Sequence, residues 1–173
     1  MIIRGVCGII IILGAGYTGM LFSAKLYEKV KQIEAFEKML SLLLFNIDFM
    51  AIPLCRAMLQ ISGNLPNPAN KLLLIAGGIM KNRPDAKASQ CWKEAIDRCR
   101  KDILLNNDEI EILYSFGENM DTSEKENCVA NINITLAKLK FIKEEAFSKF
   151  KKDGNMWRGM GFLVGILIVI LLI

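Results

Sequence analysis

The 173-residue sequence contains no histidine. Histidine is the side chain that most often acts as acid or base near neutral pH, and it is the commonest metal ligand. A serine or cysteine nucleophile would therefore lack its usual base, and the chain has no phosphate-binding P-loop. The adjacent acids Glu144 and Glu145 stand among lysines, as on a solvated helix face. We predict a protein that is not an enzyme and that binds no cofactor or metal ion.

Cysteine pairs of the CxxC type are also absent. Such pairs are typical of zinc sites and redox motifs. The cysteines instead stand singly, at positions Cys7, Cys55, Cys91, Cys99 and Cys128. Isolated cysteines in apolar or helical sequence are usually buried free thiols in a reducing compartment, and we predict that state for them.

Charge is nearly balanced over the whole chain and scarce at both ends. The 22 Lys and Arg against 18 Asp and Glu leave a net charge of +4, too small to indicate a nucleic-acid-binding protein. No acidic residue occurs in residues 1–24 or 156–173, where Arg4 and Arg158 are the only cations. The remaining charges lie in residues 25–155, which suffice for one hydrophobic core.

The uncharged ends have the properties of membrane spans. Twenty uncharged residues follow Arg4, the number that a transmembrane helix needs. Fifteen uncharged residues follow Arg158, about 22 Å of helix, and Trp157 and Arg158 suit the membrane interface. We predict an N-terminal transmembrane segment over residues 1–24, a cytoplasmic helical bundle domain over residues 25–155 and a C-terminal transmembrane segment over residues 156–173.

A cleaved signal peptide is the alternative interpretation of the N-terminal end, because Arg4 resembles the positive region of such peptides. The mature chain would then be an exported, tail-anchored helical binding protein. However, the apolar run is long, and Phe22 is bulky where the cleavage pattern requires a small residue. We therefore favour a retained anchor.

The first span also contains a GxGxxG pattern, from Gly14 to Gly19. This pattern marks a dinucleotide site only when strands surround it. The residues that follow have helical spacing, and no later stretch alternates as a strand does. Close packing in the membrane explains the glycines better. We expect Gly14 and Gly19 to pack against Gly161 and Gly165 of the second span.

The middle of the chain predicts an all-α fold. Apolar residues from Ile33 to Met50 and from Val129 to Phe150 recur at helical spacing and mark two long helices. Prolines, asparagines and glycines divide the sequence between them into shorter helices. Their expected limits are Pro53 to Ile61, Asn67 to about Met80, Asp85 to about Lys101 and Asp108 to about Met120, before a last helix that starts at a Ser123–Glu126 capping box. The fold class is a bundle of about six helices, whose long, antiparallel first and last helices extend into the two spans.

Charge is unevenly distributed within this domain. Residues 71–101 carry eight Lys and Arg against three acids, whereas residues 108–126 carry seven acids against Lys125 alone. Such flanks can steer assembly with partners or with further copies of the chain, but they can also face each other or be solvated. A mid-helix glycine in Phe116–Gly117–Glu118 costs about 1 kcal/mol and indicates close helix approach. The candidate partner-binding residues are Glu111, Phe116, Gly117, Glu118 and Glu124.

The cations beside the predicted spans indicate an orientation. Seven Lys and Arg flank the spans on the domain side, against Arg4 alone on the other side. Because cytoplasmic flanks of membrane spans are enriched in cations, we expect the domain in the cytoplasm and both termini outside.

The C-terminal pattern from Met156 to Gly165, with Trp157, Arg158, Gly161, Phe162 and Leu163 in fixed order, resembles the stage III sporulation protein AB family of endospore-forming bacteria. Further similar residues follow one another along the whole chain, at Thr18–Gly19, Ala24–Lys25, Tyr27, Gln32–Ile33, Pro53–Leu54, Trp92 and Phe116–Gly117–Glu118.

The resemblance implies a component of the complex that links the mother cell to the forespore during engulfment. It also implies a domain similar to the cytoplasmic helical domains of platform proteins in type II secretion and type IV pilus machines. The implied partners are the stage III sporulation protein AA ATPase and other components of the same channel complex. The predicted spans add membrane lipids as a partner, and the charged flanks add further copies of the chain. The implied location is the cell membrane, with the domain on the cytoplasmic side of the mother cell.

Overall fold

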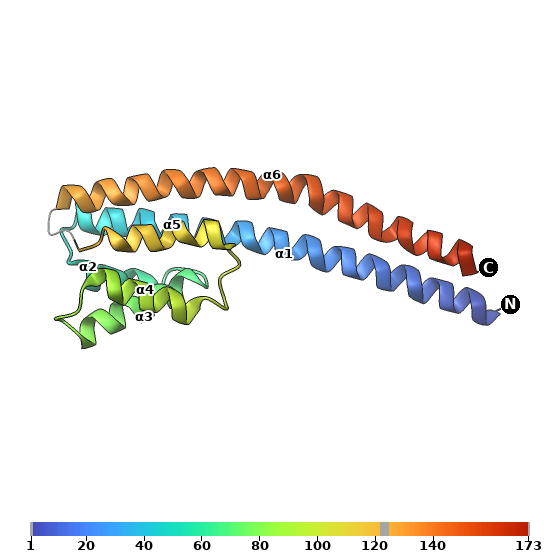
Figure 1. The fold of residues 1–173 in the computed structure, drawn as a ribbon, viewed down its shortest axis with the longest axis horizontal. Coiled ribbons are helices and arrows are strands. Elements are labelled where there is room, and N and C mark those ends of the chain that lie inside the picture. Colours follow the sequence, from blue (N-terminus) through green and yellow to red (C-terminus); the bar gives the residue numbers. More distant parts are fainter. Residues whose placement is uncertain (1, 122–124, 173) are drawn as a thin grey trace. The chain divides into compact units, whose positions relative to one another are not determined.

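The computed structural model describes the backbone of residues 2–121 and 125–172, and the side chains of residues 21, 23–121, 125–152 and 163. Over this backbone the chain forms six α-helices and no strand (Figure 1). The helices are α1 (Ile2–Asp48), α2 (Leu54–Ser62), α3 (Ala69–Asn82), α4 (Ala88–Cys99), α5 (Asn107–Glu118) and α6 (Lys125–Leu172). The predicted all-α fold of about six helices is confirmed.

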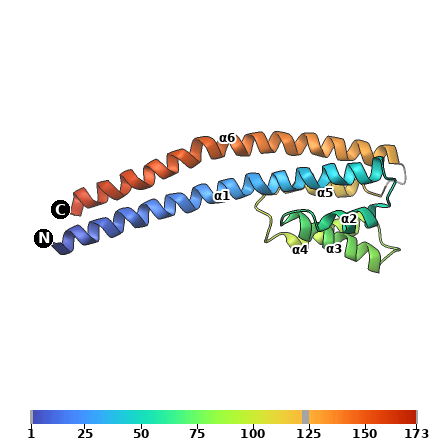
Figure 2. The same ribbon diagram turned by 180° about the vertical axis from the view of Figure 1, so that it is seen from behind.

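The helices form two compact units. Unit 1 comprises Met1–Val30 and Glu144–Ile173, and unit 2 comprises Lys31–Lys143. In unit 1 the first part of α1 and the last part of α6 lie side by side and antiparallel (Figures 1 and 2). The rings of Tyr27 and Phe150 pack with their centroids 5.4 Å apart in this unit. The GxGxxG stretch is helical within α1, so it does not form the strand and turn of a dinucleotide fold.

The two predicted membrane spans, over residues 1–24 and 156–173, fall almost entirely on residues whose side chains lie outside the described set. The same holds for the predicted packing glycines and for Trp157 and Arg158. Among the described residues, no helix contains a stretch that is both long and apolar enough to cross a bilayer. The spans and their packing therefore stay predictions.

In unit 2, the apolar stripe of α1 forms the centre of the core. Ile33, Phe36, Leu40 and Leu43 are fully buried, as their helical spacing predicts. Met50 is the exception and is exposed, because α1 ends at Asp48 and the chain turns away. Ala51 makes this turn with φ 49°, and the N–H of Ile52 donates to the carbonyl of Asn46.

Two ion pairs join α1 to α6 in unit 2. Lys143 pairs with Glu37 at 2.5 Å, and Lys125 pairs with Asp48 at 3.0 Å. Asp48 at the end of α1 thus meets Lys125 at the start of α6, whereas Glu37, earlier in α1, meets Lys143, later in α6. The two segments therefore run antiparallel, as predicted. Ile132 and Leu139 supply the buried face of α6.

The helices α2, α3 and α4 lie together beside these long segments (Figures 1 and 2). The structure corrects two of the predicted helix starts. Asp85 does not cap α4, because residues 83–86 form a turn in which the N–H of Ala86 donates to the carbonyl of Arg83. The helix begins later, at Ala88. Asn67 likewise does not cap α3, which begins after Pro68 without a side-chain cap.

The linker between α4 and α5 has no helical structure but is held at several points. The Gln32 side chain of α1 donates to the carbonyl of Asp102 at 3.0 Å and accepts from the N–H of Leu104 at 2.8 Å. Lys71 of α3 pairs with the Asp102 carboxylate at 2.6 Å. Two side chains of the linker itself, Ile103 and Leu105, are buried. The linker is therefore an ordered part of unit 2.

Four of the five cysteines lie in the described part of the chain, and all four are free thiols, as predicted. Cys91 and Cys99 are buried, and Cys55 and Cys128 are half-buried. Burial raises the pKa of the Cys99 thiol, which keeps it in its unreactive protonated form. Cys7 lies outside the described side chains.

Candidate partner-binding groove

A surface groove of about 420 Å³ lies between α4 and α5 in unit 2. Two of the predicted partner-binding residues, Glu111 and Glu118, line it. They stand seven residues apart on α5, with Tyr114 between them, and so share one helix face. This groove, called the acidic groove below, is lined by Ser89, Gln90 and Lys93 of α4 and by Glu111, Tyr114 and Glu118 of α5.

The start of α5 is fixed by a capping box. The Asn106 side chain accepts from the N–H of Glu109, and the Glu109 carboxylate accepts from the N–H of Asn106, both at 3.0 Å. This reciprocal pair satisfies two of the free N–H groups of the first turn. The predicted start at Asp108 is correct to within one residue, since α5 begins at Asn107, and the cap fixes where α5 presents Glu111.

A tryptophan locks α4 against α5 beneath the groove. The indole of Trp92 is fully buried, and its N–H donates to the carbonyl of Leu113 at 2.7 Å. Its ring meets Phe116 edge to face, with centroids 5.3 Å apart and planes at 81°. Gly117 provides the space, because a Cβ atom there would lie 2.2 Å from Trp92 Cδ1. The close helix approach predicted from this mid-helix glycine is confirmed.

Phe116 and Gly117 therefore support the groove from inside and do not line it. Phe116 is buried, and its carbonyl accepts from the Asn131 side chain of α6 at 2.9 Å. A partner on the surface would contact Glu111 and Glu118 and not these two residues. Glu124, the remaining candidate, lies outside the described residues.

Two further carboxylates bind the polar residues of the groove. Asp97 accepts a hydrogen bond from the Tyr114 hydroxyl at 2.6 Å. Burial and this hydrogen bond raise the pKa of Tyr114 to about 12. Asp121 accepts from both the N–H and the hydroxyl of Ser89. Burial opposes ionisation of Asp121, but the bonds from Ser89 outweigh it and lower its pKa.

The exposed charges of the groove are left for a partner. In the part of the chain whose side chains are described, no ion pair engages Glu111, Glu118 or Lys93. Elsewhere the two flanks do meet, because Lys87 lies near enough to Asp121 to favour its ionised form. Two free carboxylates against one ammonium give the groove an acidic character.

The arrangement suits the binding of another protein. Carboxylates and amide oxygens accept hydrogen bonds from lysine, arginine or amide groups of another protein. Among the described residues, no group of three or more cysteines and acids is placed to hold a metal ion. Sequence reasoning missed the contributions of Ser89, Gln90, Lys93 and Tyr114. Of these residues, Tyr114 could have been identified from the sequence. It stands three residues after Glu111 and four before Glu118, which places it on the same helix face.

Comparisons with known proteins agree along the length of the chain. The family model described as stage III sporulation protein AB matches residues 4–173. The stage III sporulation protein AB of Bacillus subtilis (strain 168) is 26% identical over 165 residues, which cover 95% of each chain. A solved structure titled stage III sporulation protein AB shares the fold, with a TM-score of 0.65 and 22% identity over 71% of this chain and 96% of the other.

Proposed function

Because the chain belongs to the stage III sporulation protein AB family, we propose that it is a non-catalytic membrane platform component of the channel complex between mother cell and forespore. The acidic groove is its docking site for the ATPase of that complex. Family membership supports a role in sporulation, and the geometry of the groove supports docking.

The observation that carries the docking site is the pair of exposed carboxylates on rigid walls. Glu111 and Glu118 project from a capped helix that Trp92 holds in place, so little backbone freedom of the wall is lost on binding. Complementary charge would steer a cationic surface of the partner toward the groove and fix its register. The expected contact on the ATPase is a cluster of lysine and arginine residues.

Reversing both charges tests this contact. The variant Glu111→Lys/Glu118→Lys should bind the purified ATPase about tenfold more weakly in a calorimetric titration, a loss of about 1.4 kcal/mol. Unit 2 should stay folded, because both side chains are exposed. The matched control is Glu34→Lys/Asp85→Lys, which reverses two exposed acids away from the groove. Equal affinity of the two variants would remove the acidic groove as the docking site.

The membrane role rests on the two predicted spans. In this proposal residues 1–24 and 156–173 anchor the chain, and the domain faces the cytoplasm of the mother cell. A variant that keeps Cys55 as its sole cysteine tests the topology with a membrane-impermeant maleimide after urea treatment. Labelling in inverted vesicles but not in intact protoplasts is the expected result. Labelling in intact protoplasts, or a mature N-terminus near Lys25, would contradict it.

A further inference from the structure

A second groove, of about 340 Å³, lies on unit 2 between α3 and α4 and shares no lining residue with the acidic groove. Two arginines stand at this groove, Arg83 at the end of α3 and Arg98 in the last turn of α4. Aliphatic side chains of α3 form the rest of its wall. This basic groove is lined by Leu74, Ile75, Gly78, Ile79, Arg83 and Arg98, together with Asn82.

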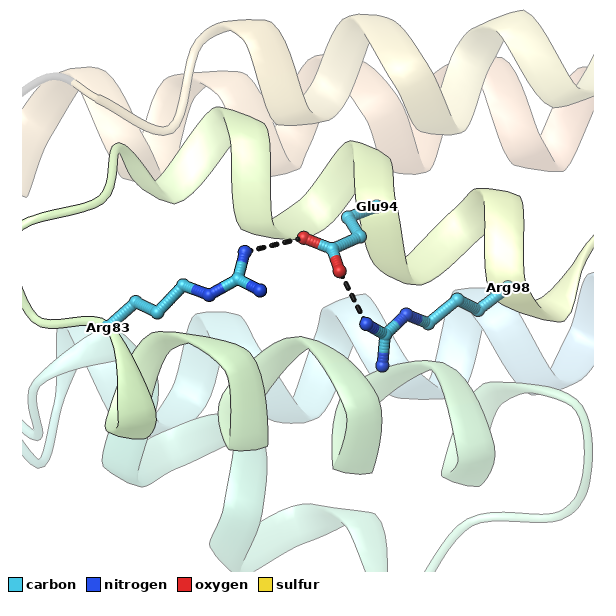
Figure 3. A network of polar contacts seen from close by, with 3 residues as sticks. All are labelled: Arg83, Glu94 and Arg98. Atoms are coloured by element: carbon cyan, nitrogen blue, oxygen red, sulfur yellow. Dashed lines mark hydrogen bonds and ion pairs between the residues drawn. The ribbon is translucent and has the colours of Figure 1, made fainter.

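One carboxylate holds both arginines in place. Figure 3 shows Glu94 between the two guanidinium groups. Arg83 Nη1 lies 3.1 Å from one carboxylate oxygen, and Arg98 Nη2 lies 2.5 Å from the other. The backbone of Arg83 is itself fixed, since its N–H donates to the carbonyl of Ile79 at 2.9 Å. The two guanidinium groups are thus ordered without a ligand, which lowers the entropy cost of binding one.

The network leaves charge and donors exposed. Two guanidinium groups and one carboxylate sum to one net positive charge. Each guanidinium has five N–H donors, and Glu94 takes one from each. The side chains of Arg83 and Arg98 are 62% and 55% exposed, so their remaining donors face solvent. A single further carboxylate would meet this charge, in the bidentate geometry that arginine favours.

The aliphatic side chains of the groove determine which kind of ligand fits beside the arginines. Leu74 is 48% exposed, although Leu73 before it is fully buried, and a Cβ atom on Gly78 would meet nothing within 4 Å. This space next to the arginines suits an aliphatic side chain. A free phosphate ion would leave this apolar space empty, and Glu94 would repel the second negative charge of a phosphate dianion. An acidic residue one helical turn from a leucine or isoleucine fits both parts of the groove.

We propose that the basic groove binds an acidic amphipathic helix of another protein, with a glutamate or aspartate on Arg83 and Arg98 and an aliphatic side chain against Leu74 and Gly78. This site is separate from the acidic groove, and it does not depend on the proposed ATPase contact. Unit 2 would then join two partners of opposite charge.

The probe is a pair of fluorescent helical peptides with the same leucine face, one flanked by glutamates and the other by lysines. Binding is measured by anisotropy with the full chain in nanodiscs of zwitterionic lipid. The acidic peptide is expected to bind and the lysine peptide is not, and added salt should weaken binding. An acidic peptide whose leucines are replaced by alanine should also bind more weakly.

Variants assign the binding to the groove. Arg83→Ala/Arg98→Ala should weaken the acidic peptide at least about tenfold, which corresponds to about 1.4 kcal/mol. Gly78→Leu should do so without loss of charge, because its side chain fills the groove. The control Lys38→Ala/Arg56→Ala removes two exposed cations elsewhere and should leave affinity unchanged. Circular dichroism verifies that each variant is folded.

Several results would overturn the proposal. These are equal binding of the lysine peptide, no binding of the acidic peptide, or equal losses in the control and the double arginine variant. Competition by inorganic phosphate or by anionic vesicles that matches competition by unlabelled acidic peptide would identify an anion or lipid site instead. A sedimentation shift showing that the chain self-associates through Arg83 and Arg98 would identify a second copy as the occupant.

Discussion

The variant Gly117→Ala tests the packing that supports the acidic groove. At an exposed helix position this change stabilises a protein by about 1 kcal/mol, because alanine has the higher helix propensity. At position 117 the new Cβ would lie 2.2 Å from Trp92 Cδ1 and 3.0 Å from Trp92 Cγ. The indole cannot move aside freely, since it is fully buried and its N–H is bonded to Leu113.

The magnitude follows from three contributions. Overpacking a core costs about 1–3 kcal/mol, and breaking the buried indole hydrogen bond costs about 1–3 kcal/mol more. The helix-propensity gain offsets about 1 kcal/mol of this cost. The expected net loss is about 3 kcal/mol of unfolding free energy. For a unit of this size the midpoint of thermal unfolding should fall by roughly 12 °C.

The assay is urea and thermal unfolding of the full chain in detergent, in a Trp157→Phe background so that fluorescence reports Trp92 alone. Gly78→Ala is the matched control, because Gly78 also lies inside a helix but its Cβ would meet nothing within 4 Å. The control should gain up to about 1 kcal/mol. If Gly117→Ala gains stability like the control, the close approach of Trp92 is refuted. In a Trp92→Leu background, followed by circular dichroism, the cost of Gly117→Ala should vanish.

Three further changes test other parts of unit 2. Ala51→Gly should stabilise it by about 0.5–1 kcal/mol in urea unfolding, because Ala51 has φ 49° and glycine adopts this conformation without a Cβ clash; a loss of stability would contradict the turn. Asn106→Ala should cost about 1 kcal/mol in the same assay by removing the capping box of α5, whereas Asn119→Ala beyond its other end should cost less. Tyr114 has a folded pKa of about 12, above its ordinary value near 10, so its contribution to stability is complete below pH 10 and is lost as the pH rises toward 12. Its tyrosinate absorbance step near pH 12 should be missing in Tyr114→Phe, and a step unchanged in that variant would contradict the assignment.

The helices were predictable because their signals are local. The stripe from Ile33 to Leu43 and the start of α5 near Asp108 each depend on residues within one or a few turns, and the structure places both within a residue of the prediction. Asp85 shows the limit of this reasoning. An aspartate next to a proline can cap a helix, but it can equally lie in a turn. The hydrogen bond from the N–H of Ala86 to the carbonyl of Arg83 shows that a turn forms here.

The groove was only half predictable, for a different reason. The excess of acids over residues 108–126 indicated Glu111 and Glu118, because charge bias is visible along the sequence. Lys93 and Ser89 come from another helix, and their place beside α5 depends on how Trp92 meets Gly117. A single sequence contains the tryptophan and the glycine but not the information that they touch.

The arrangement of charges in the basic segment, residues 71–101, could not be predicted from the sequence either. The sequence showed eight cations against three acids over residues 71–101, but not how these charges are arranged. In the structure Glu94 joins two of them and Asp102 pairs with Lys71. Arg83, Arg98 and Glu94 form one ordered positive site with an apolar neighbour, because Glu94 lies where it binds both arginines.

The linker held by Gln32 has a consequence for amide hydrogen exchange. Helical N–H groups exchange slowly because they are bonded, and linkers usually exchange fast. The N–H of Leu104 is bonded to a side chain 72 residues away, so it can exchange only when α1 separates from the linker. This amide should therefore report opening of the α1–linker contact, while the ends of nearby helices exchange by local fraying. The slowest sites in this protein need not all be helical.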